Sequence, residues 1–498
     1  GIDSPDFNLP VAKYLKKQLD IKIIQYVSPS VWAWRKGRIK GMESSIDLVF
    51  ALFPFETEAY KNSSIKVSYI GHPLAYKFPI KKLESSLELK PKFENNNKLP
   101  SSADVVIVGA GYTGLSAALT LSKAGKNVIV LDSEVIGFGA STRNGGMLGS
   151  GHKVSSEQAV KKYGSEIASQ LHKEANASLA FTTNLIKENN IDCDLQICGR
   201  LRTSWLPQDQ INMSKNLKKL KAIEHFNSNM IEPELMSESI ETDLYFGGQF
   251  YQDHGAVQPR KFHYGLLNLA INAGAKVFGS RPVIQVNKIS KSREPTFNVL
   301  TSTSTIQCQQ VLMATNGCTR SNLSRYLSRR VLPVPSFIIT TVDIGKDKVQ
   351  SLLPGGHCMV ETRKRYCYYR ATPCGRRIML GTRAAMHAMK AEEVLPTLRK
   401  MLTEIFPSLV DVEISHCWTG FTGFSFSQLP NLNSNKGIYS ALGYCGNGVA
   451  MAPYLGHKAA LKILNPNQRA TVFEQTPLET RPYYFGKPWF LPIASAYF

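Results

Sequence analysis

The chain has 498 residues, a hydrophobic fraction of 43% and a formal net charge of +21. The hydrophobic fraction is typical of globular protein, and the length suffices for about two to four domains. The charge lies in short scattered clusters without a zinc-finger, ribonucleoprotein or helix-turn-helix signature. It therefore argues against nucleic acid and favours a basic surface or contact with an anionic membrane.

The nine cysteines form no CxxC pair. An odd number without a disulfide spacing is typical of reduced thiols, so we expect a cytoplasmic protein. No signal peptide is visible, and no stretch approaches the roughly 20 apolar residues of a spanning helix. Because no convincing cluster of metal ligands occurs, we expect no metal.

Residues 1–78 alternate between helical and strand patterns. A helical pattern in "VAKYLKKQL" is followed by the strand-like runs "IKIIQYV", "IDLVFALF" and "KVSYIG", with short helical segments between them. This alternation predicts an α/β layer with parallel strands. Three strands are too few for a complete doubly wound sheet, so we expect part of a domain. The polar residues 79–102, with a run of asparagines, predict a linker.

The front segment resembles lipid-A-disaccharide synthase, a sugar-nucleotide-dependent glycosyltransferase of Gram-negative bacteria. The stretches "GIDSPDFNLPVAKYL", "YVSPSVWAWRKGRIK", "LFPFETEAY" and "YIGHPLA" carry the resemblance. It implies Asp3 or Asp6 as the catalytic acid and allows peripheral contact with the inner membrane of such a bacterium. The beginning of that family and its sugar-nucleotide domain have no counterpart, so we expect no synthase activity.

A dinucleotide-binding motif follows the linker. A buried strand, "ADVVIVGAG", ends in Gly109, Gly111 and Gly114, a helical pattern follows, and a second strand, "KNVIVLD", ends in Asp132. Glycine permits the tight turn and the approach of backbone to a pyrophosphate, while the acid suits a ribose hydroxyl. We assign the neighbouring Tyr112, Thr113 and Ser133 to the same nucleotide site.

The segment "SEVIGFGASTRNGGMLGSG" distinguishes FAD from NAD. A nicotinamide domain normally proceeds to another strand–helix pair, whereas this chain stays rich in glycine and then enters long helical patterns. Such backbone can line a long cofactor beyond its pyrophosphate, so we expect FAD. The residues assigned to it are Gly139, Ala140, Ser141, Arg143, Asn144, Gly145 and Gly146.

From this motif onward the chain resembles the FAD-dependent amine and amino-acid oxidoreductases, and within them the γ-glutamylputrescine oxidase type. The resemblance covers about residues 103–498 and also rests on "HGAVQPRKFHYGLLNLAINAGAKV", "VLMATNGCT" and "GYCGNGVAMAPYLG". It implies a Rossmann-like FAD-binding domain and an antiparallel-sheet substrate domain, so the whole chain would combine α/β and α+β parts. The expected limits are 103–165, 250–330 and 420–465 for the FAD domain, 166–249 and 331–419 for the substrate domain, and 466–498 for a C-terminal extension.

Three later segments supply further cofactor candidates. Small residues end one strand, a glycine turn opens a helix whose N-terminus suits the negative charge of a reduced flavin, and one valine matches the strand that contacts adenine in the family. An ordinary buried strand, a simple helix cap and a core valine are the alternatives for these segments. The candidates are Ala314, Thr315 and Gly317, then Gly446, Asn447, Gly448 and Val449, and finally Val283. Cys445 is expected to be a small apolar residue rather than a redox group.

The stretch "RYCYYRATPCGRRIMLGTRA" resembles the family's strand pair over the flavin. It implies Tyr369 and Arg370 as substrate-facing residues, with Tyr251 and Tyr368 next, although any one tyrosine could be an ordinary strand residue. Where the family usually has an acid before a Leu-Pro or Met-Pro pair, this chain has Ser427 and Gln428.

The resemblance implies oxidation of an amine or amino acid by hydride transfer to flavin N5, followed by hydrolysis of the imine. Oxygen or a quinone would then reoxidise the flavin. Such chemistry belongs to the cofactor and needs positioning and a desolvated pocket more than a strong base. The alternative is a non-catalytic anion- or lipid-binding fusion of a glycosyltransferase remnant with a degenerate flavin domain.

Overall fold

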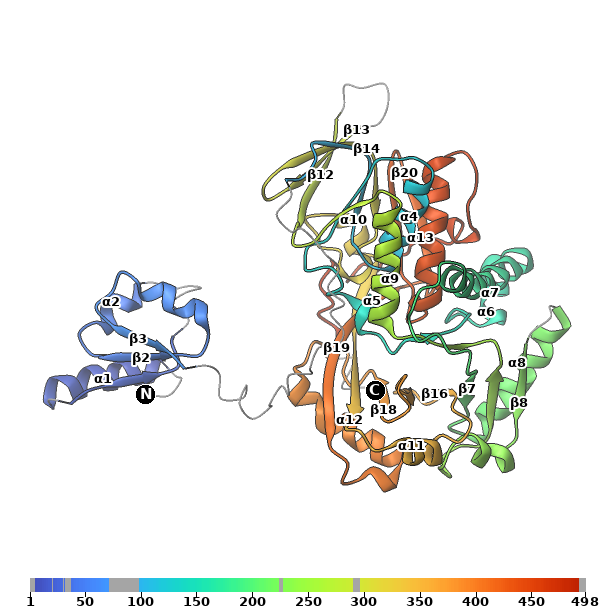
Figure 1. Ribbon diagram of the computed structural model, residues 1–498, viewed down its shortest axis with the longest axis horizontal. Coiled ribbons are helices and arrows are strands. Elements are labelled where there is room, and N and C mark those ends of the chain that lie inside the picture. The colour runs from blue at the N-terminus through green and yellow to red at the C-terminus, as the bar shows by residue number, and fades with distance from the viewer. Residues whose placement is uncertain are drawn as a thin grey trace. The chain divides into compact units, whose positions relative to one another are not determined.

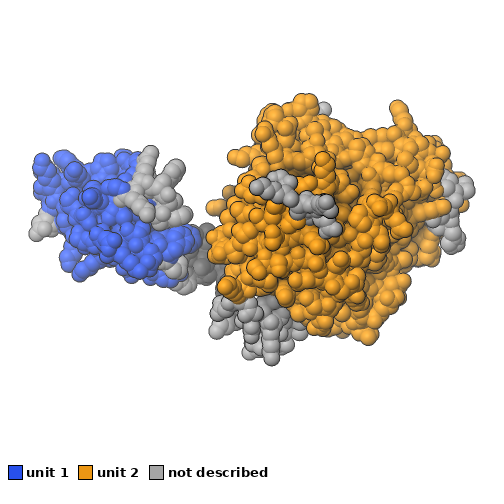
Figure 2. Space-filling view, turned by 90° about the horizontal axis from the view of Figure 1, so that it is seen from above, with its two compact units in different colours: residues 1–89 blue, residues 90–498 orange. Residues whose placement is uncertain are grey.

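The computed structural model describes residues 5–19, 21–29, 31, 37–70, 98–223, 227–289 and 296–491. The chain divides into two compact units, Gly1–Leu89 and Lys90–Phe498 (Figure 2). The first unit ends inside the segment predicted as a linker. Among the described residues, no helix combines the length and the apolar character that a membrane crossing requires.

Unit 1 contains a small parallel sheet in the order β1-β2-β3. Alternating buried residues such as Val49 and Ala51 turn one face of β2 toward the core. Met42, Ile46 and Tyr60 pack into the same small cluster. The elements are α1 (Pro5–Gln18), β1 (Ile24–Tyr26), α2 (Arg38–Met42), β2 (Leu48–Ala51), the 3₁₀ helix η1 (Pro54–Tyr60) and β3 (Lys66–Tyr69). The prediction of parallel strands in an α/β layer is confirmed.

The first sheet of unit 2 has the order β11-β5-β4-β14-β13-β12, and β21 with its partner β20 joins it at β14. The pairs among β11, β5, β4, β14 and β21 are parallel, whereas β12, β13 and β14 form an antiparallel meander. Continuous apolar runs explain the parallel centre, because both faces of β5 are buried. The strands are β4 (Ser102–Val108), β5 (Val128–Leu131), β11 (Lys276–Phe278), β12 (Val283–Ile289), β13 (Thr296–Thr301), β14 (Thr305–Met313), β20 (Asn431–Asn435) and β21 (Ile438–Leu442).

Helices α4, α9, α13 and α7 run beside this sheet (Figure 1). The close crossing of α4 and α13 depends on Gly456, because a Cβ there would lie 2.2 Å from the carbonyl oxygen of Thr113. The helices and short strands of this part are α4 (Tyr112–Lys123), α5 (Ala140–Arg143), β6 (Met147–Leu148), α6 (Ser156–Tyr163), α7 (Ser165–Glu188), β10 (Gly255–Ala256), α9 (Pro259–Asn272), η3 (Asn316–Cys318), α10 (Arg325–Ser328), α13 (Gly448–Leu464) and η5 (Val472–Glu474).

The second sheet has the order β19-β15-β18-β17-β16-β7-β9-β8 and is antiparallel except where β16 pairs with β7. Its strands are β7 (Arg200–Thr203), β8 (Ser228–Ile231), β9 (Gly248–Tyr251), β15 (Val331–Thr341), β16 (Cys358–Glu361), β17 (Cys367–Ala371), β18 (Ile378–Thr382) and β19 (Ile414–Ser425). Its helices are α8 (Pro207–Ile223), η2 (Pro233–Glu238), α11 (Lys346–Leu352), α12 (Ala391–Ile405) and η4 (Pro407–Leu409). β9 and β19 cross the expected limits at residues 250 and 420, and both belong to this sheet along their whole length.

Candidate active site

The glycine loop after β4 turns directly into α4. Gly109 has φ of 109°, which favours glycine, and a Cβ on it would lie 2.7 Å from the carbonyl oxygen of Ala314 at the end of β14. A Cβ on Gly114 would lie 1.9 Å from the carbonyl oxygen of Gly109. The loop, the helix and β14 therefore meet backbone to backbone, with no room for side chains.

Asp132 lies at the end of the neighbouring strand and closes the loop. Its Oδ2 accepts the amide of Ala110 at 2.8 Å, and its Oδ1 accepts the amide of Glu134 at 3.1 Å. Burial raises the pKa of this carboxyl, and these amides act against the rise. The carbonyl of Asp132 accepts the amide of Arg281, which brings the start of β12 at Val283 close to this strand end. Ser133 follows as an exposed residue.

The N-terminus of α4 presents backbone amides rather than side chains. The Tyr112 side chain packs on Phe262, with ring centroids 4.8 Å apart, and the Thr113 hydroxyl lies 2.6 Å from that of Tyr444. The Tyr112 amide donates to Ser141 Oγ at 3.0 Å, which ties α4 to α5 after Gly139. The first amides of a helix have no acceptor inside the helix, so this end suits an anion.

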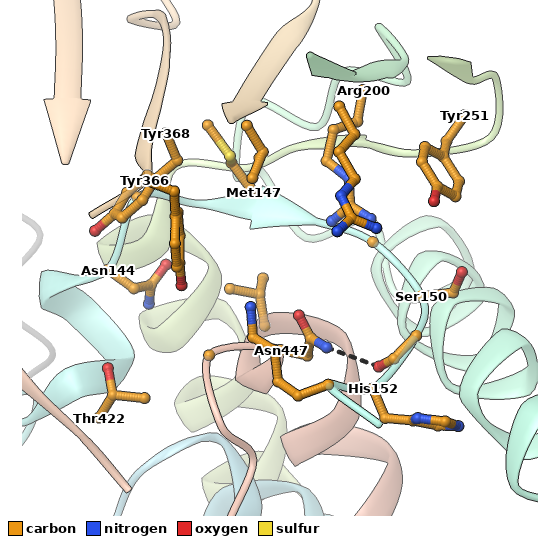
Figure 3. A pocket seen from close by; sticks show the side chains of 18 of the residues that line it. Asn144, Met147, Ser150, His152, Arg200, Tyr251, Tyr366, Tyr368, Thr422 and Asn447 are labelled. Carbon is orange, nitrogen blue, oxygen red and sulfur yellow. Dashed lines mark hydrogen bonds between the residues drawn. The ribbon is translucent and has the colours of Figure 1, made fainter. Parts of the chain in front are cut away.

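A cavity of about 480 Å³ lies between the glycine-rich segment, the N-terminus of α13 and the second sheet (Figure 3). Asn447 caps α13 and donates from Nδ2 to the Gly151 carbonyl at 2.8 Å, which joins two of these walls. Ten of the residues predicted from sequence line this cavity: Ala140, Arg143, Asn144, Gly145, Gly146, Tyr251, Tyr368, Gly446, Asn447 and Val449.

Tyr369 does not face the cavity, so its expected substrate contact is wrong. Its side chain is fully buried in the core of the second sheet, where its hydroxyl lies 2.8 Å from that of Tyr245. The cause is the period of two along a strand. Tyr366 and Tyr368 lie on the cavity side of this segment, and Tyr369 points to the other side.

Arg370 is also corrected, from a substrate ligand to a positioning residue. Its buried guanidinium donates to the carbonyls of Gly145 and Val257, each at 2.9 Å, and it does not line the cavity. Gly146 permits this contact, because a Cβ there would lie 2.7 Å from Arg370 Nη2. The arginine therefore holds the backbone of the glycine-rich segment that forms the cavity wall.

The remaining predicted residues have structural surroundings of their own. The Thr315 hydroxyl lies 2.6 Å from that of Thr319, and a Cβ on Gly317 would come within 3.1 Å of Gly423 Cα. Gly448 is the first residue of α13 but does not line the cavity. Cys445 is buried, and burial raises its thiol pKa, as suits a small apolar residue.

Sequence reasoning missed Tyr366, Arg383, Lys153, Arg200 and Arg202, which all line the cavity. Arg383 Nη2 donates to the Tyr366 hydroxyl at 2.8 Å, and Lys153 Nζ lies 4.9 Å from the ring centroid. Burial would raise the pKa of the Tyr366 phenol, but the charges of Lys153 and Arg383 outweigh it and lower the pKa below 10.0. Alternation with Tyr368 was the signal that could have found Tyr366.

The donor set fits a flavin dinucleotide. A glycine cradle and the start of α4 suit a pyrophosphate, Asp132 suits a ribose, and the start of α13 faces the cavity where a flavin ring would lie. Among the described residues, no group of three or more histidine, cysteine or acidic side chains could hold a metal ion. The fold and the site together define a dinucleotide-binding protein with a second sheet over the cofactor end.

Comparison with known proteins identifies the family. The family model described as FAD dependent oxidoreductase matches residues 104–461, and the chain belongs to this family. It is 30% identical over 387 residues to a probable oxidoreductase OrdL of Rhizobium meliloti, covering 76% of this chain and 87% of that protein. It is 28% identical over 387 residues to γ-glutamylputrescine oxidoreductase of Escherichia coli, with the same two shares. The fold resembles glycine oxidase from Geobacillus kaustophilus, with a TM-score of 0.63 and 19% identity over 77% of this chain and all of that one.

The front of the chain matches a second family model, described as lipid-A-disaccharide synthetase, over residues 1–104. This match runs beyond the limit of 78 expected from sequence. The front is 49% identical over 107 residues to lipid-A-disaccharide synthase of Acinetobacter baylyi, covering 20% of this chain and 27% of that protein. Asp3 lies outside the described residues, and Asp6 is an exposed residue of α1 that pairs with Arg38.

Proposed function

We propose that this protein oxidises an amine or an amino acid, with FAD as the electron acceptor. The observation that carries the proposal is the cavity beside the N-terminus of α13, where the Tyr366 phenol lies between two cations. The names of γ-glutamylputrescine oxidoreductase and glycine oxidase support the substrate class. The bound FAD supplies an acceptor, at N5, for the hydride that leaves the carbon next to nitrogen.

The amine must be neutral before its carbon can release a hydride, so the site needs a group that takes one proton from the ammonium form. Tyr366 Oη is suited to this task, because Arg383 and Lys153 favour the phenolate. The products of the oxidation are an imine and the proton that Tyr366 holds. Water then adds to the imine carbon and releases a carbonyl compound and the nitrogen fragment.

Positioning supplies much of the remaining catalysis. Asn447 joins α13 to the Gly151 segment, and Arg370 fixes Gly145, so two walls of the cavity keep their spacing. Oxygen or a quinone is the second substrate. Formation of hydrogen peroxide in step with the carbonyl product would mark oxygen as the acceptor.

The proton-transfer role is tested by Tyr366→Phe. The wild-type rate of anaerobic flavin reduction should rise with pH through the lowered pKa of Tyr366. In the variant we expect a rate about 100-fold lower near neutral pH, with the rise displaced toward the pKa of the free amine. The exposed Tyr326→Phe is the matched control. A pH profile unchanged in Tyr366→Phe would remove this residue from the mechanism.

We propose peripheral membrane contact by unit 1 as a second candidate function. Phe7, Val11 and Tyr14 are exposed at helical spacing on α1, at 70%, 40% and 65%. Lys13 and Lys17 on the same helix suit anionic headgroups. Co-sedimentation with anionic but not neutral liposomes, lost in Phe7→Ser, would support this candidate. Equal sedimentation with both vesicles would contradict it.

A further inference from the structure

Strand β7 turns two arginines toward the cavity. Leu201 and Thr203 are fully buried in the sheet core, while the alternate residues Arg200 and Arg202 line the cavity. Figure 3 shows Arg200 and Tyr251 extending into the cavity at the far side of the view from Tyr366. The cavity is therefore cationic at this end as well as beside Tyr366.

The Arg200 guanidinium has no acceptor within the described part of the chain. It lies over the Tyr251 ring, 5.1 Å from the centroid, and makes neither a hydrogen bond nor an ion pair there. Burial lowers its pKa, and the exposed Asp253 acts on it only as a nearby charge. A buried cation without a hydrogen-bonded partner is costly, so an anion that filled this place would be stabilised.

His254 supplies a second donor without a partner. Its Nε2 accepts the amide of Ser150 at 3.2 Å, so a neutral imidazole carries its proton on Nδ1. That Nδ1 is buried and has no partner among the described residues. A Cβ added at Gly149 would lie 2.9 Å from His254 Nδ1 and 2.8 Å from Arg200 Nη1. Both unpaired donors thus flank Gly149, which lines the cavity.

We propose that Arg200, with Arg202 beside it, binds a carboxylate of the substrate at the end of the cavity remote from Tyr366. A guanidinium whose face lies on a tyrosine ring leaves its edge for two parallel N–H bonds, which matches a planar carboxylate. This inference rests on the proposed function, and it narrows the substrate to an amine whose carboxylate is separated by a chain from the oxidised carbon.

The test uses pentanoate, which has no amine to oxidise, and its neutral amide, pentanamide. Calorimetric titration of the FAD-loaded protein should detect pentanoate at an affinity at least about 10-fold above that of pentanamide. Arg200→Met should lower the pentanoate affinity about 10-fold or more, and Arg200→Lys less. Arg202→Met should give a smaller loss, and the exposed Arg469→Met should give none. FAD content and thermal melting are measured for each variant.

Equal binding of pentanoate and pentanamide, or wild-type pentanoate affinity in both Arg200→Met and Arg202→Met, would overturn the inference. Tighter binding of inorganic phosphate than of pentanoate would also overturn it. Should Arg200→Met fail to fold, Arg200→Lys and Arg202→Met still decide the matter. Pentanoate binding with these losses, in a protein whose flavin no amine reduces, would support the carboxylate site and reject the proposed oxidation. The converse result would reject the carboxylate site alone.

Discussion

The two units differ in how closely they match their relatives and in how much of those relatives they span. Unit 1 lies in a segment 49% identical to a synthase but covering 27% of it, whereas the family part of unit 2 is 30% identical to a relative and covers 87% of it. Unit 1 has one small core cluster, while unit 2 has three large ones. High identity in a short segment therefore indicates shared ancestry, but a functional site needs strand and helix ends that lie far apart in the chain.

A glycine substitution in each unit gives the largest expected contrast. Gly114→Ala in unit 2 places a Cβ 1.9 Å from a backbone oxygen, so the helix must move away from the loop. We expect a loss of about 1–3 kcal/mol in stability and of most bound FAD, measured as flavin absorbance per protein. Gly41→Ala in α2 of unit 1 meets nothing within 4 Å and should leave FAD content unchanged. Equal FAD content in the two variants would contradict the loop geometry.

Arg370→Met should destabilise unit 2 by about 3 kcal/mol, because it leaves the carbonyls of Gly145 and Val257 without their donors. Arg376→Met on the same hairpin removes only an exposed pair with Asp343 and should cost under about 1 kcal/mol. Urea unfolding of both variants measures the difference. Similar losses would show that Arg370 does not hold the cavity wall.

Acid should weaken unit 2 through its buried histidines. Burial lowers the pKa of His152 and of His263 to about 4, and it lowers that of His254 well below 6.5. The unfolded chain takes up these protons first, so stability falls as pH drops from 6.5 toward 4, by about 1.4 kcal/mol per pH unit for each imidazole. His152→Gln should reduce that slope by one proton in denaturant titrations. A slope that His152→Gln leaves unchanged would contradict its buried, neutral state.

Removal of residues 1–97 should have the smallest effect. The strands of unit 1 pair only with one another among the described residues, so no strand pairing of unit 2 is lost. We expect the FAD content and the rate of anaerobic flavin reduction to stay within about twofold of those of the full chain. A large loss of either would show that the two units depend on each other.

Local sequence patterns predicted the parts of the site that depend on backbone. The spacing of Gly109 and Gly114 and the position of Asp132 each have a geometric cause within one βαβ stretch, and the structure brings these residues together. Side-chain direction on the second sheet was harder to predict. Strand phase decides between Tyr368 and Tyr369, and a shift of one residue exchanges cavity for core. Arg200 and Arg383 come from separate strands, and nothing local in the sequence places them at one cavity.

Anaerobic titration of the purified protein with amines tests the central claim most directly. The flavin absorbance should bleach when an amine of the correct class is added in the absence of oxygen, and an amine with a remote carboxylate should act at the lowest concentration. The colour should return when the acceptor is admitted. A protein that retains FAD and is bleached by none of a panel of polyamines, glycine, sarcosine, D-amino acids and carboxylated amines would contradict the account.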